Sequence, residues 1–105
     1  MHSNRIARLL LLTVSLEACS ISQIPTIREY AGGLIGQNVS VVRSLTEGKT
    51  SYASRVGWQE KTYPLANGHW IYVQPDRPNC EIHFEVNGED LIVGYTPMGS
   101  GCQYQ

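Results

Sequence analysis

Apolar residues follow two different periods along this chain. Between residues 26 and 48 they recur at helical spacing, and from residue 58 onward they alternate with polar residues, as in half-buried strands. Helical and strand-forming segments that follow one another in blocks are typical of α+β folds. We therefore expect two short N-terminal helices packed on an antiparallel β-meander of three to four strands.

The first predicted helix begins after Thr26. Thr26 and Glu29 have the spacing of a capping box, in which each side chain bonds the backbone amide of the other residue. The helix should continue through Leu34 and Ile35 and stop at Gly36, because glycine is a common helix terminator. The alternative is a loosely helical linker, because Gly32 and Gly33 each disfavour a helix interior by about 1 kcal/mol.

A second helix is predicted between Asn38, a favourable N-cap, and Gly48. Three residues at helical spacing should form its buried stripe: Val39, Val42 and Leu45. Residues 49–57 are polar and have no period, which indicates a loop with room for one turn of helix.

The first predicted hairpin joins residues 60–65 to residues 69–74. The intervening Asn67-Gly68 is a strong signal for a two-residue type I′ turn. Such a turn would pair Tyr63 with Tyr72 and place large rings on one face. Pro64 marks the first strand as a sheet edge, because proline lacks the amide that a central strand must donate.

The second predicted hairpin begins with the clearest strand of the chain, residues 80–86, where apolar and polar residues alternate. After a turn at residues 87–90, residues 91–95 return. The expected pairs share one face and are Val86 with Leu91, Phe84 with Val93 and Ile82 with Tyr95. Residues 96–102 should then bend back toward Cys80.

Residues 1–18 have the layout of a secretory signal. Arg5 and Arg8 precede an apolar run that ends at Leu16, and this run is shorter than the roughly 20 residues that a transmembrane helix needs.

The sequence Leu16-Glu17-Ala18-Cys19 resembles the lipobox of bacterial lipoproteins, in which the cysteine is acylated and becomes the first residue after cleavage. This resemblance implies a lipid anchor at Cys19, a tether over residues 19–25 and one domain over residues 26–105. Two or three acyl chains anchor durably, since each buried CH₂ contributes about 0.8 kcal/mol. In the lipoproteins that this segment resembles, a residue other than aspartate after the cysteine, here Ser20, implies transfer to the periplasmic face of the outer membrane. The alternative is an ordinary thiol at Cys19.

The charges are balanced and dispersed, with a net charge of −1 over 105 residues. This pattern gives no electrostatic footprint for nucleic acid and no polybasic patch for anionic lipid. The domain left after the signal is near the lower size limit for a single core, so a covalent staple is expected.

Cys80 and Cys102 remain once Cys19 is acylated, and an even pair in an oxidising compartment is typical of a disulfide. The chain-entropy model gives such a bridge roughly 3 kcal/mol. The alternative is a metal site formed by Cys80, His83 and Cys102. Strand alternation disfavours that site because it points Cys80 and His83 to opposite faces. We expect no metal and no other cofactor.

No group of residues indicates catalysis. His69 lies beside the predicted turn and His83 on the solvent face of a strand, and these are the histidines outside the signal. We therefore expect a protein that is not an enzyme.

Two sets of residues are candidates for surface contacts. An aromatic set is either core or a partner surface, depending on whether helices cover it: Trp58, Tyr63, Trp70 and Tyr72. An acidic set reads as a solvated edge that discourages strand pairing, with a cation or partner site as the alternative: Glu81, Glu85, Glu89 and Asp90.

The order of anchor, two helices and meander resembles the small BamE/SmpA/OmlA-like outer-membrane lipoproteins and a wider set of uncharacterised bacterial lipoproteins. The matching segments are Gly36 with residues 38–45, residues 65–73, residues 80–86, and residues 92–94 with Gly101-Cys102. The resemblance implies a role beside the machinery that assembles outer-membrane β-barrels.

Two function classes follow. The first is a lipid-anchored, non-enzymatic scaffold or assembly accessory that contacts an envelope protein. The alternative is an inhibitor or ligand-binding lipoprotein, related to lysozyme, phage or conjugation. A well-ordered protruding loop at residues 87–90 or 96–101 would favour this alternative.

Overall fold

A computed structural model describes residues 25–102 and shows an α+β domain. The predicted signal, Cys19 and the last three residues lie outside the described residues. The helices are α2 (Ile27–Gly32), α3 (Val39–Glu47) and α4 (Tyr52–Arg55), and the strands are β1 (Lys61–Pro64), β2 (Trp70–Arg77), β3 (Cys80–Val86) and β4 (Ile92–Met98). The predicted fold class is confirmed at this level.

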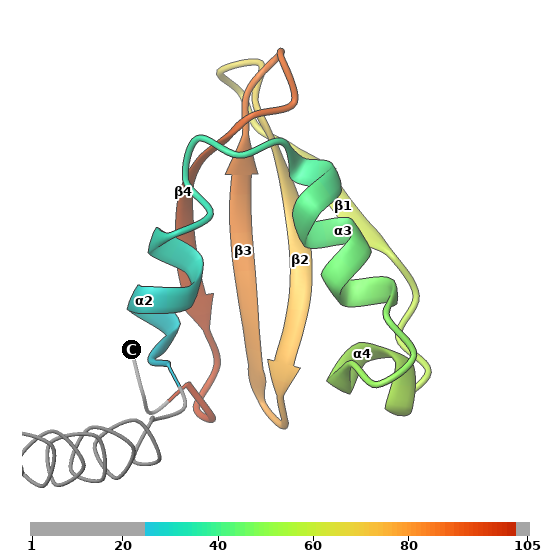
Figure 1. The fold of residues 1–105 in the computed structure, drawn as a ribbon. Coiled ribbons are helices and arrows are strands. Elements are labelled where there is room, and N and C mark those ends of the chain that lie inside the picture. The colour runs from blue at the N-terminus through green and yellow to red at the C-terminus, as the bar shows by residue number, and fades with distance from the viewer. Residues whose placement is uncertain (1–24, 103–105) are drawn as a thin grey trace, which may run out of the picture.

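The four strands form one antiparallel sheet in the order β1-β2-β3-β4. Helix α2 lies against β4, and α3 lies over β2 on the same face (Figure 1). The predicted meander is therefore confirmed, and β1, which contains Pro64, is an edge strand as expected.

The hydrophobic core lies between α2, α3 and one face of the sheet, which we call the inner face. Alternate residues of β3 point into it, and the burial pattern along this strand alternates without a break. The core residues from the helices are Ile27, Ala31, Val39 and Val42, and those from the strands are Tyr72, Cys80, Ile82, Phe84, Val86 and Ile92.

Helix α2 has the predicted start but a different end. The Thr26 hydroxyl accepts from the Glu29 amide at 3.1 Å, and the Glu29 carboxylate accepts from the Thr26 amide at 3.0 Å. The helix stops at Gly32, so the prediction that it continues through Leu34 and Ile35 is wrong. The reason is tertiary, because the chain turns so that the Gly36 amide donates to the Ile92 carbonyl of β4.

Helix α3 starts at its predicted cap, where Asn38 Oδ1 accepts from the Ser40 amide. Val39 and Val42 are buried, but Leu45 is 47% exposed, and Thr46 takes the third buried position instead. Thr46 Oγ1 donates to the Val42 carbonyl and accepts from Gln74 Nε2 at 3.1 Å. Because Gln74 lies on the inner face and needs a hydrogen-bond partner, the helix buries Thr46 rather than the predicted Leu45.

The first hairpin has a three-residue loop, so its predicted pairing is wrong by one residue. The Leu65 amide donates to the His69 carbonyl, and of the two predicted turn residues only Gly68 has positive φ (+87°). A three-residue loop with glycine in this conformation is the next common hairpin type. Tyr63 therefore pairs with Ile71 rather than Tyr72. Because strands alternate, this shift moves Tyr63 to the outer face.

The second hairpin also differs in register. Asp90 has positive φ (63°), the loop closes between Asn87 and Leu91, and a bulge follows at Val86. Val86 therefore pairs with Ile92, and Phe84 with Tyr95. Ile82 pairs with Pro97, so the three predicted pairs, Val86 with Leu91, Phe84 with Val93 and Ile82 with Tyr95, are all wrong. The extra residue of the bulge lets buried Ile92 and half-buried Tyr95 reach the core while Val93 stays exposed.

The predicted disulfide between Cys80 and Cys102 is present, with Cα atoms 4.9 Å apart. Its formation leaves neither sulfur as a thiolate ligand, so the metal alternative with His83 is not realised. Between residues 25 and 102, no helix is long and apolar enough to cross a bilayer.

Candidate functional site

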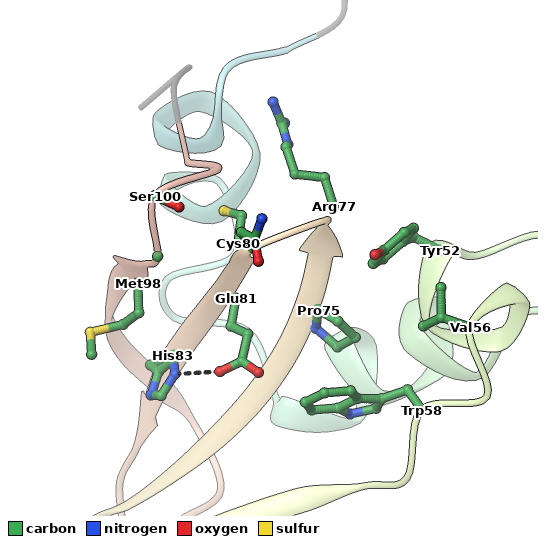
Figure 2. Close-up of a pocket in the computed structure, with 12 residues that line it drawn as sticks. Tyr52, Val56, Trp58, Pro75, Arg77, Cys80, Glu81, His83, Met98 and Ser100 are labelled. Carbon is green, nitrogen blue, oxygen red and sulfur yellow. Dashed lines mark hydrogen bonds and ion pairs between the residues drawn. The ribbon is translucent and has the colours of Figure 1, made fainter.

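A groove lies on the outer face of the sheet, opposite α2 and α3. Its volume is about 580 Å³. Figure 2 shows the groove bounded by α4 on one side and by the end of β4 on the other, with β2 and β3 as its floor. We call it the outer groove.

The α4 wall exists because β1 is short. Strand β1 pairs only with residues 70–73, so the second half of β2 has no strand neighbour on that side. Helix α4 fills this edge and supplies Tyr52 and Val56 to the outer groove. Its N-cap Ser51 accepts from the Ser54 amide and donates to the Thr46 carbonyl at 2.7 Å, which ties α4 to the end of α3.

Trp58 follows α4 and lies beside Pro75 of β2 (Figure 2). The Trp58 amide donates to the Ala53 carbonyl at 2.9 Å, which holds the backbone of this residue against α4. The side chain is half-buried and also lines a smaller cavity of about 250 Å³ between α3, α4 and β2. Trp58 Nε1 is the one buried side-chain nitrogen or oxygen without a partner in the described part of the chain.

A hydrogen-bonded chain of three side chains runs across the outer face of the sheet and ends in the groove at His83 and Glu81. Tyr63 Oη lies 2.7 Å from His83 Nδ1, and His83 Nε2 lies 3.2 Å from Glu81 Oε1. A carboxylate only accepts, so Nε2 donates to Glu81, and in the neutral imidazole Nδ1 then accepts from the Tyr63 hydroxyl. Because β2 lies between β1 and β3, this bridge passes over outer-face Val73, which is fully buried.

The bridge changes the interpretation of His83. The alternation of β3 predicts an exposed histidine, yet the His83 side chain is only 12% exposed. The Tyr63 ring packs against it edge-on at 5.8 Å between centroids. Both imidazole nitrogens already have hydrogen-bond partners, so the orientation of the His83 ring in the lining of the outer groove is fixed.

The far end of the groove depends on a close backbone contact. A side chain at Gly99 or Gly101 would overlap the carbonyl oxygen of Asn79 or Pro78, respectively. The Gly101 amide donates to the Asn79 carbonyl at 2.8 Å, and the disulfide joins the same two segments. Met98 and Asn79 are thereby brought to the same end of the cavity.

The structure does not bring the four predicted aromatic residues to one surface. Tyr72 is 1% exposed in the core, and its burial raises the pKa of its hydroxyl. Trp70 packs partly buried against the same core, whereas Tyr63 and Trp58 lie on the outer side of the sheet and beside it. Only Trp58 lines the outer groove.

The predicted acidic set is likewise divided. Glu81 lines the groove, while Glu85 Oε2 lies 2.6 Å from His69 Nδ1 and also accepts from Asn67. The hydrogen bond from His69, followed by that from Asn67, lowers the pKa of Glu85. Glu89 and Asp90 are exposed in the β3–β4 turn. Within residues 25–102, no three His, Cys, Asp or Glu side chains are placed to hold a metal ion.

Sequence reasoning did not single out several residues that line the groove, among them Tyr52, Val56, Pro75, Arg77, Asn79 and Met98. They come from four separate segments, and no local pattern marks them. The single available signal was the set of glycines after Met98, because glycines near a cysteine pair indicate a close backbone approach.

Comparison of the chain with protein-family models, with curated proteins and with solved structures finds no match.

Proposed function

We propose that this protein is a lipid-anchored, non-enzymatic component of the bacterial cell envelope that contacts another envelope component through the outer groove. The anchor is Cys19, and the location is the periplasmic face of the outer membrane. The resemblance to BamE/SmpA/OmlA-like lipoproteins makes outer-membrane protein assembly the first process to test.

The observation that carries this proposal is the exposed apolar rim of the groove. Val56 is 52% exposed on one side and Met98 is 49% exposed on the other, with Trp58 and Pro75 between them. Exposed apolar residues around a half-buried tryptophan are typical of contact surfaces. The disulfide supports an oxidising compartment, and the engagement of both His83 nitrogens supports a binding role over catalysis.

Two experiments test the two parts of the proposal. Mass spectrometry of the native protein should show an acylated N-terminal Cys19, and Cys19→Ser should release the protein from the membrane fraction. A photoreactive residue at Val56 should crosslink to an envelope component in intact cells. The matched control is the same residue at Leu45, which is similarly exposed on α3. Equal crosslinking from both positions would contradict the groove as the contact site.

A second candidate function, an inhibitor, is favoured by the β3–β4 turn. Asn87 Oδ1 accepts from the amides of Glu89 and Leu91 at 2.9 and 3.0 Å, which orders the turn internally. The turn projects at the end of the sheet beside the β1–β2 loop (Figure 1). A lysozyme inhibition assay tests this function, and Asn87→Ala should weaken any inhibition because it loosens the turn.

A further inference from the structure

The composition of the outer groove defines the class of its ligand. We propose that it binds a neutral oligosaccharide chain. This inference rests on the groove being the contact site of the proposed function, and it specifies what the groove contacts.

The first argument is the combination of ring faces and apolar side chains in the groove. Trp58 and Tyr52 come from the α4 side, Pro75 lies on the floor and Met98 on the opposite side (Figure 2). A sugar ring presents axial C–H groups on its faces and hydroxyl groups around its edge. Large amphipathic aromatic side chains suit such a ligand, because they cover its apolar face while their polar ends remain able to hydrogen-bond.

The second argument is the geometry of the polar groups around those side chains. Asn79 and Glu81 supply an amide and a carboxylate. Each of these planar groups carries two adjacent donors or acceptors, which match the neighbouring hydroxyl groups of a sugar ring. A few convergent polar groups in a mainly apolar cavity are the usual arrangement of a specific ligand site.

The third argument is charge. The lining residues include one formally positive side chain, Arg77, and one formally negative side chain, Glu81. The Arg77 side chain points away from the other lining side chains (Figure 2) and its Nε donates to Asp76 at 2.7 Å, while the Glu81 carboxylate accepts from His83 Nε2. The groove therefore presents no positive charge to attract an anionic polymer, and an uncharged ligand is compatible with it.

A fourth, independent observation comes from Trp58. Its indole N–H is buried without an acceptor, and leaving a buried donor unpaired costs about 1–3 kcal/mol. The ring lines both the outer groove and the smaller cavity, so a ligand in the groove would contact it. A sugar hydroxyl in the outer groove would supply that acceptor.

Tryptophan fluorescence provides the test, because the chain has two tryptophans. The protein should be titrated with an N-acetylglucosamine hexamer, with maltohexaose and with a heparin hexasaccharide as the anionic control. We expect saturable binding of at least one neutral oligomer and weaker binding of heparin. Trp70 packs against the core, so Trp70→Phe should keep the ligand-induced change. Trp58→Phe should lose it.

Calorimetry of variants tests the position of the site. Trp58→Ala should weaken binding at least tenfold, and Leu45→Ala should leave it unchanged. If Trp58→Ala does not fold, Asn79→Gly and Glu81→Gln test the position of the site instead. Each should weaken oligosaccharide binding severalfold. Asn79→Gly suits the positive φ of 58° at this position. The absence of binding to both neutral oligomers, tighter binding of heparin, or unchanged affinity in the groove variants would overturn the inference.

The result separates this inference from the proposed function. Crosslinking from Val56 without oligosaccharide binding would refute the oligosaccharide as the ligand but would still support the outer groove as the contact site. If the protein binds an oligosaccharide but its native Cys19 is not acylated, the proposed lipid anchor is refuted and the proposed oligosaccharide site is still supported.

Discussion

Side-chain hydrogen bonds stabilise the start of a helix and the contact between helices and sheet in this small domain. The clearest local case is the capping box at the start of α2, where Thr26 and Glu29 satisfy each other's backbone amides. The clearest buried case joins Tyr30, Thr46 and Gln74, three side chains from α2, α3 and β2. Both cases give predictions for single substitutions.

The first prediction concerns acid stability. The Thr26 backbone amide, and to a smaller extent the Thr26 hydroxyl, donate hydrogen bonds to the Glu29 carboxylate and lower its pKa below the usual 4.5. A lowered folded-state pKa stabilises the protein above the unfolded value, and this stabilisation is lost as the pH falls through the folded value. Glu29→Gln should therefore be less stable than the native protein at pH 7 but not at a pH well below 4.5.

Urea unfolding at both pH values measures this difference. Glu89→Gln is the control, because Glu89 is exposed and no hydrogen bond of its carboxylate is found within the described residues. A gap between Glu29→Gln and the native protein that stays constant with pH would contradict the prediction.

The second prediction concerns the buried network. Thr46→Val keeps the side-chain shape but removes the acceptor 3.1 Å from Gln74 Nε2. One amide hydrogen of buried Gln74 would then be unpaired, which costs about 1–3 kcal/mol. Chemical denaturation should show this loss, whereas Ser44→Ala, on the exposed side of the same helix, should change stability by less than about 0.5 kcal/mol. Equal effects of both substitutions would refute the network.

At the scale of elements, strand lengths and turns decide where the outer groove forms. Strand β1 is shorter than β2, and α4 occupies the edge that β1 leaves unpaired. The chain after β4 packs closely against the β2–β3 turn at Gly99 and Gly101, where there is no space for a side chain. The groove is the space between these two additions to the sheet.

The third prediction follows from that close approach. Gly99 has φ +122°, and a Cβ there would overlap the Asn79 carbonyl. Gly99→Ala should therefore destabilise the domain by more than about 1 kcal/mol, because both the backbone conformation and the space are incompatible with alanine. Gly88→Ala is the matched control, since nothing lies within 4 Å of the added carbon. Equal midpoints of thermal unfolding for the two variants would contradict this role.

At the scale of the whole molecule, one covalent bond joins the start of β3 to the chain beyond β4. Cys80 and Cys102 are both buried and belong to the core cluster. The bond therefore closes the second hairpin at its open end and supports both the core and one end of the outer groove. A domain of this size has a small free energy of unfolding, so the disulfide contributes a large share of it.

The fourth prediction measures that effect. Reduction, or the double variant Cys80→Ser/Cys102→Ser, should lower the free energy of unfolding by about 2–4 kcal/mol. Thermal unfolding with and without reductant provides the comparison, with the double variant as the control that should not respond to reductant. Identical melting temperatures of the native protein in both conditions would refute the bridge.

The elements that sequence predicts well here are those determined by neighbouring residues. The Thr26 and Asn38 caps, the alternation of β3 and the edge position of β1 all depend on chemistry within a few residues, and all are present. Register was predicted less well, because a three-residue loop and a β-bulge each shift a strand by one position. One such shift moved Tyr63 from the expected aromatic face to His83.

The sequence by itself determined the fold class, the cysteine pair and the expectation of a lipid anchor, because composition, period and short motifs are properties of the chain. The tertiary structure alone decided that the aromatic residues separate, that Thr46 replaces Leu45 in the core, and that an outer groove exists. The physical reason is that burial and cavity shape depend on which distant segments meet. Tyr52, Asn79 and Met98 come together only after the sheet has formed.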